Sequence, residues 1–243
     1  MAERNRWGIE VGMGRYLKPD MFCDSNAKNV SRIVSSLINQ DTSFLNAIQT
    51  IYHFVKNNIW FCGPPGTLNP ASKTLSAGKG CANSKSALLV SMFRNLGIPA
   101  YFQAFLISGI VFSEYIPDYL KNYKEKYYLH LRPLVRIGKK WVSVEGVIPD
   151  DKFLETMIKK YSLSHPAKGI GISTESSLSK LNARLSSWDG ENETFCMDSS
   201  VTTSLGEVID VSNLYLKYRK NSIVSRIVSS MIEKKMEAIR TSL

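Results

Sequence analysis

One short stretch of the sequence constrains the chain more than any other: SAGKGCANSKSALLVSMFRNLGIPAYF, from Ser76 to Phe102. A cysteine after a glycine-rich turn opens a run whose apolar residues recur at helical spacing. The run predicts a mostly buried helix from Ser84 to Leu96, closed by Gly97 and Pro99. Cys81 therefore stands at the N-terminal end of a core helix, where unpaired backbone N–H groups point at its sulfur.

The elements before this helix are predicted to be helical, and those after it to be strands. Amphipathic spacing predicts a helical hairpin over residues 26–40 and 41–58, followed by a loop rich in Pro and Gly. AYFQAFLISG predicts a buried strand, and YYLHLRPLVRIGKKWVSVEGVIP predicts two strands that turn at Gly138-Lys139. Asp150–Tyr161 resembles a capped helix. This order is typical of an α+β domain.

Three segments are expected along the chain. Residues 1–162 form the α+β core, residues 163–211 form an irregular extension rich in Ser, Thr and Gly, and residues 212–243 form a basic C-terminal helix. No apolar stretch reaches the length of a membrane span. The N-terminus lacks the apolar segment of a secretory signal, so a cytoplasmic location is expected.

Cysteine usage and charge limit the function classes. Four scattered cysteines without a CxxC pattern are expected to be free thiols. The three histidines do not fall at ligand spacing, so neither a metal site nor a cofactor is predicted. The formal charge of +10 indicates affinity for anions, but no nucleic-acid-binding motif is present. An acidic protein that carries a thioester-linked substrate suits the same charge, and anion binding by the helix from Ser212 onward stays open.

Cys81 has the sequence context of a nucleophile. The helix dipole and the neighbouring Lys79 and Lys85 are expected to lower the pKa of its thiol from about 8.5 to roughly 3.5–7.5. The first backbone amides of the helix can also stabilise an oxyanion. Asn83 is either a further oxyanion donor or a helix cap. The segment equally suits a buried cysteine without reactivity.

A nucleophilic thiol needs a base and a group that orients the base. Of the three histidines, His130 is the one on a predicted strand, and Glu145 lies across the predicted hairpin, where its carboxylate can fix the imidazole tautomer. Asp150 is an alternative acid, although its position better fits the N-cap of the next helix. Trp60 either lines an acyl site or is a core or hinge residue.

TLSAGKGCANSKSALLVSMFRNLGIPAYF and HLRPLVRIGKKWVSVEGVIP together resemble the transglutaminase-like superfamily, the papain-related thiol acyltransferases and amidases, in its small bacterial and archaeal members. The shared pattern is a Gly-Cys turn, a helix ending in Arg-x-x-Gly-Ile-Pro-Ala, a His strand and a Trp-Val-x-Val-acid strand. The resemblance covers Tyr16 to Tyr161. It implies a papain-like fold in which helices, including the nucleophile helix, pack on an antiparallel sheet. It also implies Cys81 as nucleophile, His130 as base and Glu145 as orienting acid.

The function implied by this resemblance is cysteine-dependent acyl transfer on an amide or thioester carbonyl, through an acyl-enzyme on Cys81. Water as acceptor gives a peptidase or amidase, and an amine as acceptor gives an amide-forming transferase; the acceptor stays open. A catalytically degenerate binding or scaffold protein on the same fold is the alternative. It is motivated by Glu145, where the family usually has aspartate, and by one extra residue between Cys81 and Arg94.

Overall fold

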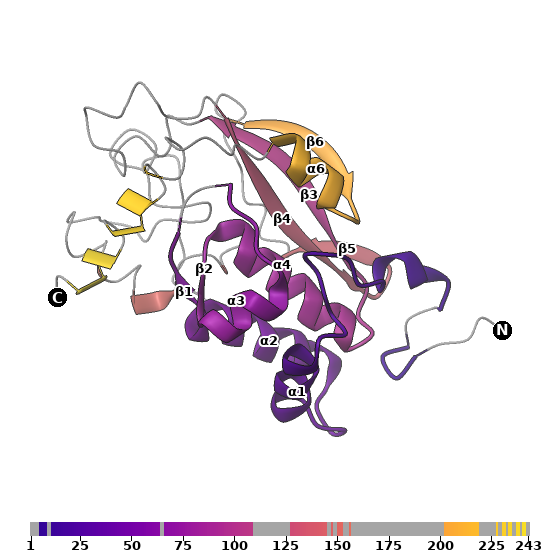
Figure 1. Cartoon of the computed structure of the whole chain (residues 1–243). Helices are drawn as coiled ribbons and strands as arrows, with labels where there is room; N and C mark the ends of the chain where they lie inside the picture. The colour runs from indigo at the N-terminus through magenta and orange to yellow at the C-terminus, as the bar shows by residue number, and fades with distance from the viewer. Residues whose placement is uncertain are drawn as a thin grey trace.

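The structure is a computed structural model in which helices lie on one side of a four-stranded sheet (Figure 1). It describes residues 5–8, 11–63, 66–108, 127–144 and 202–218, and the shorter stretches 147, 150–152, 156, 227, 230–231, 233–234, 237–238 and 240–241. Within these residues, no helix has the length and apolar character needed to cross a bilayer.

The first half of the described chain is mainly helical. Its elements are the 3-10 turn η1 (Val11–Tyr16) and the helices α1 (Lys28–Leu37), α2 (Phe44–Asn58), α3 (Ala71–Ala77) and α4 (Ala82–Asn95). The predicted helical hairpin corresponds to α1 and α2. The Ser43 hydroxyl accepts a hydrogen bond from the Asn46 backbone N–H and so caps the start of α2. The α3 helix was not predicted.

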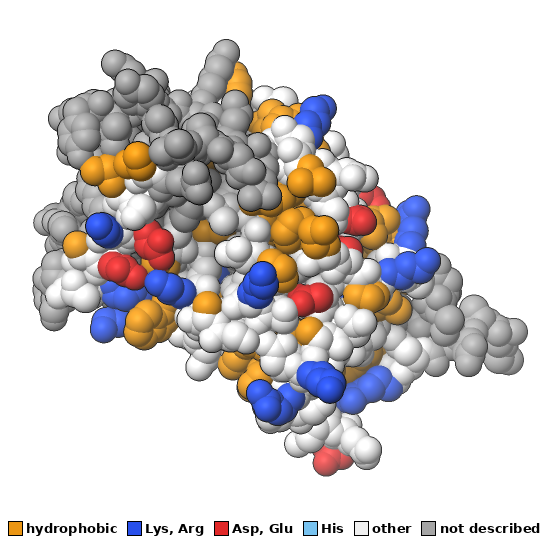
Figure 2. Space-filling view, viewed as in Figure 1, with side chains coloured by type: hydrophobic (Ala, Val, Ile, Leu, Met, Phe, Trp, Pro, Cys, Tyr) orange, Lys and Arg blue, Asp and Glu red, His pale blue; other side chains and the backbone are white. Residues whose placement is uncertain are grey.

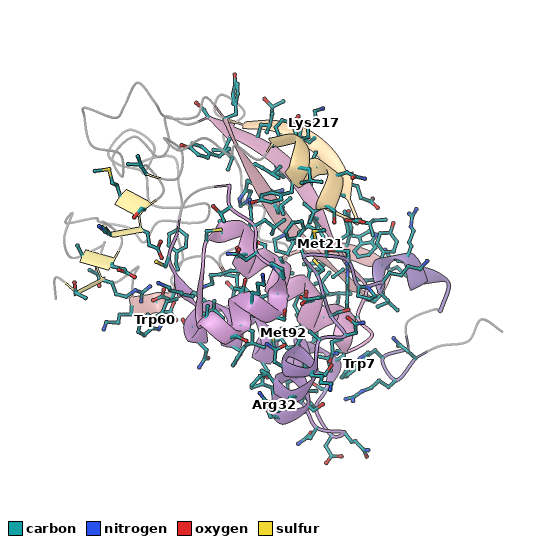
Figure 3. All side chains as sticks on the ribbon, viewed as in Figure 1. Trp7, Met21, Arg32, Trp60, Met92 and Lys217 are labelled. Carbon is teal, nitrogen blue, oxygen red and sulfur yellow. The ribbon has the colours of Figure 1, made fainter. Side chains whose placement is uncertain are left out.

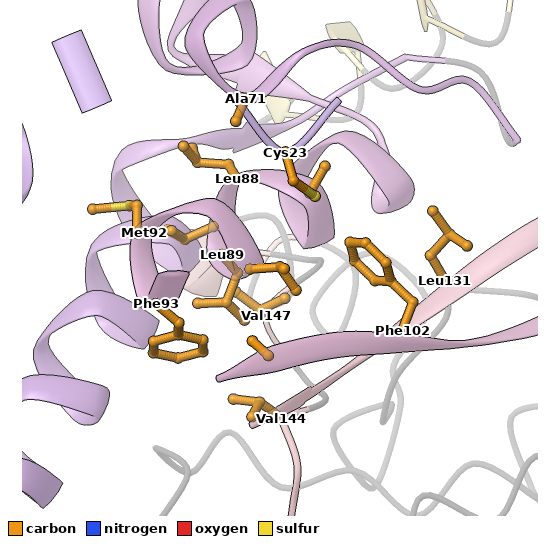
Figure 4. Packing of buried hydrophobic residues seen from close by; sticks show 14 of the residues in the cluster. Cys23, Ala71, Leu88, Leu89, Met92, Phe93, Phe102, Leu131, Val144 and Val147 are labelled. Atoms are coloured by element: carbon orange, nitrogen blue, oxygen red, sulfur yellow. The ribbon is translucent and has the colours of Figure 1, made fainter. Parts of the chain in front are cut away.

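The core is built around α4, in which every residue from Asn83 to Arg94 is buried. Figure 4 shows this packing, with Leu88, Leu89, Met92 and Phe93 of the helix close to Phe102, Leu131, Val144 and Val147. The helix ends as predicted, because Gly97 has a φ of 76° and lets the Ile98 N–H reach back to Phe93 O at 2.9 Å.

Among the described residues, four antiparallel strands form the sheet, in the order β5-β4-β3-β6. They are β3 (Ala100–Ser108), β4 (Tyr127–Ile137), β5 (Lys140–Ser143) and β6 (Thr202–Val208). The predicted hairpin is confirmed: β4 and β5 turn at Gly138-Lys139, and Ile137 pairs with Lys140. β6 lies within the tract expected to be irregular. It pairs with β3, so part of that tract belongs to the sheet.

Arg94 fixes the end of α4 to three other segments. Its Nε donates to Ala100 O, Nη1 donates to Lys18 O and to Asp20 Oδ2 at 3.0 Å, and Nη2 donates to Ile209 O. The guanidinium therefore joins the N-terminal segment, the start of β3 and the chain after β6, where α6 (Ser212–Tyr218) follows.

A second, two-stranded parallel sheet lies at the other end of α4 (Figure 1). It pairs β1 (Trp60–Phe61) with β2 (Lys79–Gly80), and β2 ends directly before Cys81. Helical residues between 227 and 241 contact this pair, as described below. On the face in Figure 2, Lys and Arg side chains are spread over several elements, so the positive charge does not gather there in one patch.

Candidate active site

Cys81 lies at the junction of β2 and α4 and is the N-cap of that helix. Its carbonyl accepts the first helical hydrogen bond, from the Lys85 N–H at 3.0 Å. Gly80 makes this junction possible, because a Cβ there would lie 2.9 Å from Thr74 Cγ2 and 3.2 Å from Ser84 Cβ. α4 follows from Ala82 onward, so the structure places the cysteine at the mouth of the buried helix, as predicted.

The Cys81 thiol is covered by the loop that precedes α3. The side chain is 3% exposed, and its Sγ donates to Thr67 O at 2.8 Å. Ser84 Oγ lies 3.4 Å from the sulfur and accepts a hydrogen bond from Asn69 N. Sequence reasoning missed Thr67 and Ser84. The only available signal was a small hydroxyl residue in the first turn of the helix.

Burial raises the pKa of the Cys81 thiol above its ordinary value. Hydrogen bonds from the Ser84 side chain and from the backbone N–H groups of Ser84 and Asn83 act in the opposite direction but do not outweigh it. The expected lowering of this pKa is therefore wrong for the structure as it stands. The helix terminus acts on the sulfur as predicted, yet exclusion of water has the larger effect.

The two lysines expected to assist Cys81 face other groups. Lys85 is fully buried, and its Nζ donates to Lys56 O and Ile59 O at the C-terminal end of α2. Lys79 is exposed and pairs with Glu233 and Glu237 at 3.2 and 3.3 Å. The predicted role of both lysines in activating the thiol is thus not supported by their contacts.

His130 lies on β4 and is 2% exposed. Asn83, two residues after Cys81, binds the backbone on both sides of His130. Asn83 Nδ2 donates to Leu129 O at 2.8 Å, and Asn83 Oδ1 accepts from the Leu131 N–H at 3.0 Å. The structure thereby brings the strand of His130 to the first turn of the helix that Cys81 caps. Asn83 lies inside α4, so its interpretation as the helix cap is wrong, and both ends of its carboxamide are engaged by β4.

The third predicted triad residue, Glu145, lies outside the described residues. The alternative acid, Asp150, is 2% exposed and accepts a hydrogen bond from the Phe61 N–H at 3.0 Å. It also forms a two-point ion pair with Arg240. This hydrogen-bonded pairing holds the pKa of Asp150 below its usual value, although burial acts the other way. Asp150 therefore serves as an anchor for β1.

Trp60, the other predicted substrate-side residue, is 56% exposed on β1, so its interpretation as a core residue is wrong. Figure 3 shows it at the edge of the molecule, on the side of the C-terminal helical residues. The Arg240 guanidinium carbon lies 5.2 Å from the centre of its ring. Trp60 and Asp150 together fix the C-terminal segment to β1.

A possible metal-ligand set lies beside the same strand pair. Within the described part of the chain, Cys62, Glu233 and Glu237 bring one ligand atom each to within 4.8 Å of the others. The Lys79 ammonium binds both carboxylates, and burial next to Glu233 raises the pKa of Cys62 to about 12. A protonated thiol and a lysine already between the carboxylates fit an ion-pair cluster better than a metal site.

The segment that holds the candidate residues matches a known protein family. Residues 31–146, which include Cys81, His130 and Glu145, match the model of the transglutaminase-like superfamily. A solved structure from Cytophaga hutchinsonii, described as a "Putative Cysteine Protease", is similar at 14% sequence identity with a TM-score of 0.41. The similarity covers 58% of this chain and 44% of that one, so this chain spans less than half of its length. A search of curated proteins found no significant match.

The family match and the described geometry concern the same segment. The cysteine helix α4, the histidine strand β4 and the strand β5, which precedes Glu145, all lie between residues 31 and 146. Residues 31–146 of this chain therefore carry a core that matches the transglutaminase-like superfamily.

Proposed function

We propose that this protein is a cysteine enzyme that transfers an acyl group from an amide or thioester, through an acyl-enzyme on Cys81. The observation that carries the proposal is the corner where β2, α4 and β4 meet. The thiol lies at the N-terminus of a buried helix, and Asn83 ties the first turn of that helix to both neighbours of His130. Covalent acyl transfer requires a nucleophile and a base that packed elements hold close together.

In the proposed reaction, His130 takes the proton of the Cys81 thiol while the sulfur attacks the substrate carbonyl carbon. The carbonyl oxygen becomes an oxyanion, which backbone N–H groups at the start of α4 stabilise. The imidazolium of His130 then gives its proton to the amine or thiol that leaves, and a thioester remains on Cys81. Water or an amine attacks this thioester and passes its proton to His130. The bond between the acyl carbon and the Cys81 sulfur then breaks, the product leaves, and the sulfur takes the proton back from His130. Glu145 is proposed to orient the imidazole.

Substrate access requires a movement of residues 66–69. In the described arrangement, the Thr67 carbonyl accepts the thiol proton at 2.8 Å and covers the sulfur. Burial raises the pKa of Cys81, which stabilises this protonated, resting form. A substrate carbonyl takes the place of Thr67 when the loop opens. Because the chain carries a formal charge of +10, acyl donors borne by acidic proteins are the first to test.

The same buried thiol favours a second candidate, a binding or scaffold protein in which Cys81 is inert. Mass spectrometry after incubation with a panel of acyl thioesters and amides separates the two. The enzyme is expected to form an acyl adduct on the peptide that contains Cys81, and an added amine should release it. His130→Ala should slow adduct formation by about 10²- to 10⁴-fold, the usual effect of a general base.

The matched control is Cys23→Ala, because Cys23 is also a buried free cysteine but lies in the hydrophobic core. The Cys23→Ala variant should form the acyl adduct on Cys81 as the unmodified protein does. The Cys81→Ala variant should fold but show neither the adduct nor turnover. Turnover retained by Cys81→Ala would refute the proposal. A Cys81 that no donor acylates, and that reacts with alkylating agents as slowly as Cys23, would favour the scaffold.

A further inference from the structure

Asn83 makes contacts that neither oxyanion binding nor helix capping explains. It is 0% exposed and lies in the first turn of α4. Its Nδ2 donates to Leu129 O, and its Oδ1 accepts from the Leu131 N–H. Both partners are backbone groups of β4, and they belong to the residues immediately before and after His130.

The carboxamide stands where a neighbouring strand would otherwise lie. β5 pairs with β4 over Leu134–Ile137, and Val144 N–H extends this edge to Pro133 O. At Leu129 and Leu131, the Asn83 side chain supplies one donor and one acceptor, as a peptide group of an adjacent strand does. Ionised Asp offers acceptors alone, and Ala or Leu offers neither a donor nor an acceptor.

These two bonds restrict how His130 can move relative to Cys81. With the peptide groups on both sides of it held to α4, the Cα of His130 cannot slide along the strand edge or lift away from the helix. A misplacement of about 1 Å between reacting groups can cost roughly 100-fold in rate. A clamp at this position therefore matters for chemistry beyond its effect on stability.

We propose that Asn83 is a positioning residue, which holds the imidazole of His130 in its place beside the Cys81 helix through the backbone of β4. This inference rests on the proposed roles of Cys81 and His130. It assigns Asn83 a different role from oxyanion binding, since both Nδ2 and Oδ1 of its carboxamide bind the backbone of β4.

The test compares Asn83→Ala and Asn83→Leu in the full-length chain. The Leu side chain fills at least the volume of the Asn side chain and adds no charge. Asn83→Leu therefore provides the test if Asn83→Ala does not fold. The matched control is Ser91→Ala, because Ser91 is also buried in α4 but its hydroxyl contacts Ala87 O and Cys23 instead of β4. The readouts are the pH profile of iodoacetamide alkylation at Cys81, resolved by peptide mapping, and the NMR imidazole resonances of His130.

Both Asn83 variants are expected to show the alkylation pH profile of His130→Ala and displaced His130 resonances, whereas Ser91→Ala keeps both readouts of the unmodified protein. A folded Asn83 variant with the original profile and undisplaced resonances overturns the inference. If His130→Ala leaves the Cys81 profile unchanged, the proposed function fails. In that case the NMR resonances of His130 alone test the role of Asn83. Displaced His130 resonances in the Asn83 variants support the positioning role, and undisplaced resonances overturn it.

Discussion

Replacing Lys85 with methionine should change how the stability of the protein depends on pH. The Lys85 ammonium is buried between the Lys56 and Ile59 carbonyls at the end of α2. Burial lowers the pKa of Lys85 to about 7, although the Asp150 carboxylate acts in the opposite direction. The ordinary value, which applies to the unfolded chain, is 10.5.

The sign of the effect follows from where the proton is held. Between pH 7 and 10.5, the unfolded chain keeps a proton on Lys85 that the folded protein releases, so the free energy of unfolding rises with pH in this window. One proton corresponds to about 1.4 kcal/mol per pH unit. Raising the pH from about 7 to 9 should therefore add roughly 2 to 3 kcal/mol through Lys85. Below about pH 7 both states hold the proton, and this contribution is lost.

Urea unfolding at pH 7, 8 and 9 measures the effect as the difference between the unmodified protein and Lys85→Met. As the pH rises from 7 to 9, the free energy of unfolding of the unmodified protein should increase by roughly 2 to 3 kcal/mol relative to that of Lys85→Met. The control is Lys73→Met, because Lys73 is exposed on α3, and its difference should stay constant. A constant difference for Lys85→Met would refute the reasoning, since it would mean that the two carbonyls and Asp150 keep the ammonium charged despite its burial.

Two further predictions concern the ends of α4. Arg94→Met leaves the Asp20 carboxylate, which is 7% exposed, without its guanidinium, and should lower the free energy of unfolding by roughly 3–5 kcal/mol. In urea unfolding, Asp20→Asn in the same chain should recover part of this loss, and a loss below about 1 kcal/mol would contradict a buried ion pair. Gly80→Ala brings a methyl group to 2.9 Å from Thr74 Cγ2, and should cost about 1–3 kcal/mol. Thr74→Ser removes that methyl group and should recover part of the melting temperature in the double variant, whereas strictly additive losses would contradict the clash.

The elements that the sequence predicted well are those whose pattern is local. α2 has a long amphipathic period and a serine cap, and the β4–β5 hairpin has alternating strands around Gly138. α3 has seven residues, too few to display a hydrophobic period. β6 lies in a tract rich in Ser and Thr, and its pairing with β3 joins segments far apart in the sequence. Such a pairing depends on long-range contacts that no window of residues reports.

In the candidate site too, the features that depend on local sequence were predicted, and those that depend on long-range packing were not. The motif places Cys81 at a helix start and His130 on a strand, because both depend on nearby residues. The directions of the side chains around them depend on packing. Lys85 lies one helical turn after Cys81 yet reaches the end of α2. The pKa of Cys81 is likewise governed by a loop that covers the sulfur, which the local sequence does not indicate.

The ion pair between Asp150 and Arg240 imposes an order on the maturation of the protein. Phe61 and Asp150 leave the ribosome well before Arg240, so the carboxylate that anchors β1 at first lacks this guanidinium. Because burying an ionised carboxylate without its counter-charge is costly, β1 and its partner strand β2 are expected to settle only after residue 240 has emerged. In a growing chain, Cys81 would therefore gain its final surroundings only after residue 240 has emerged.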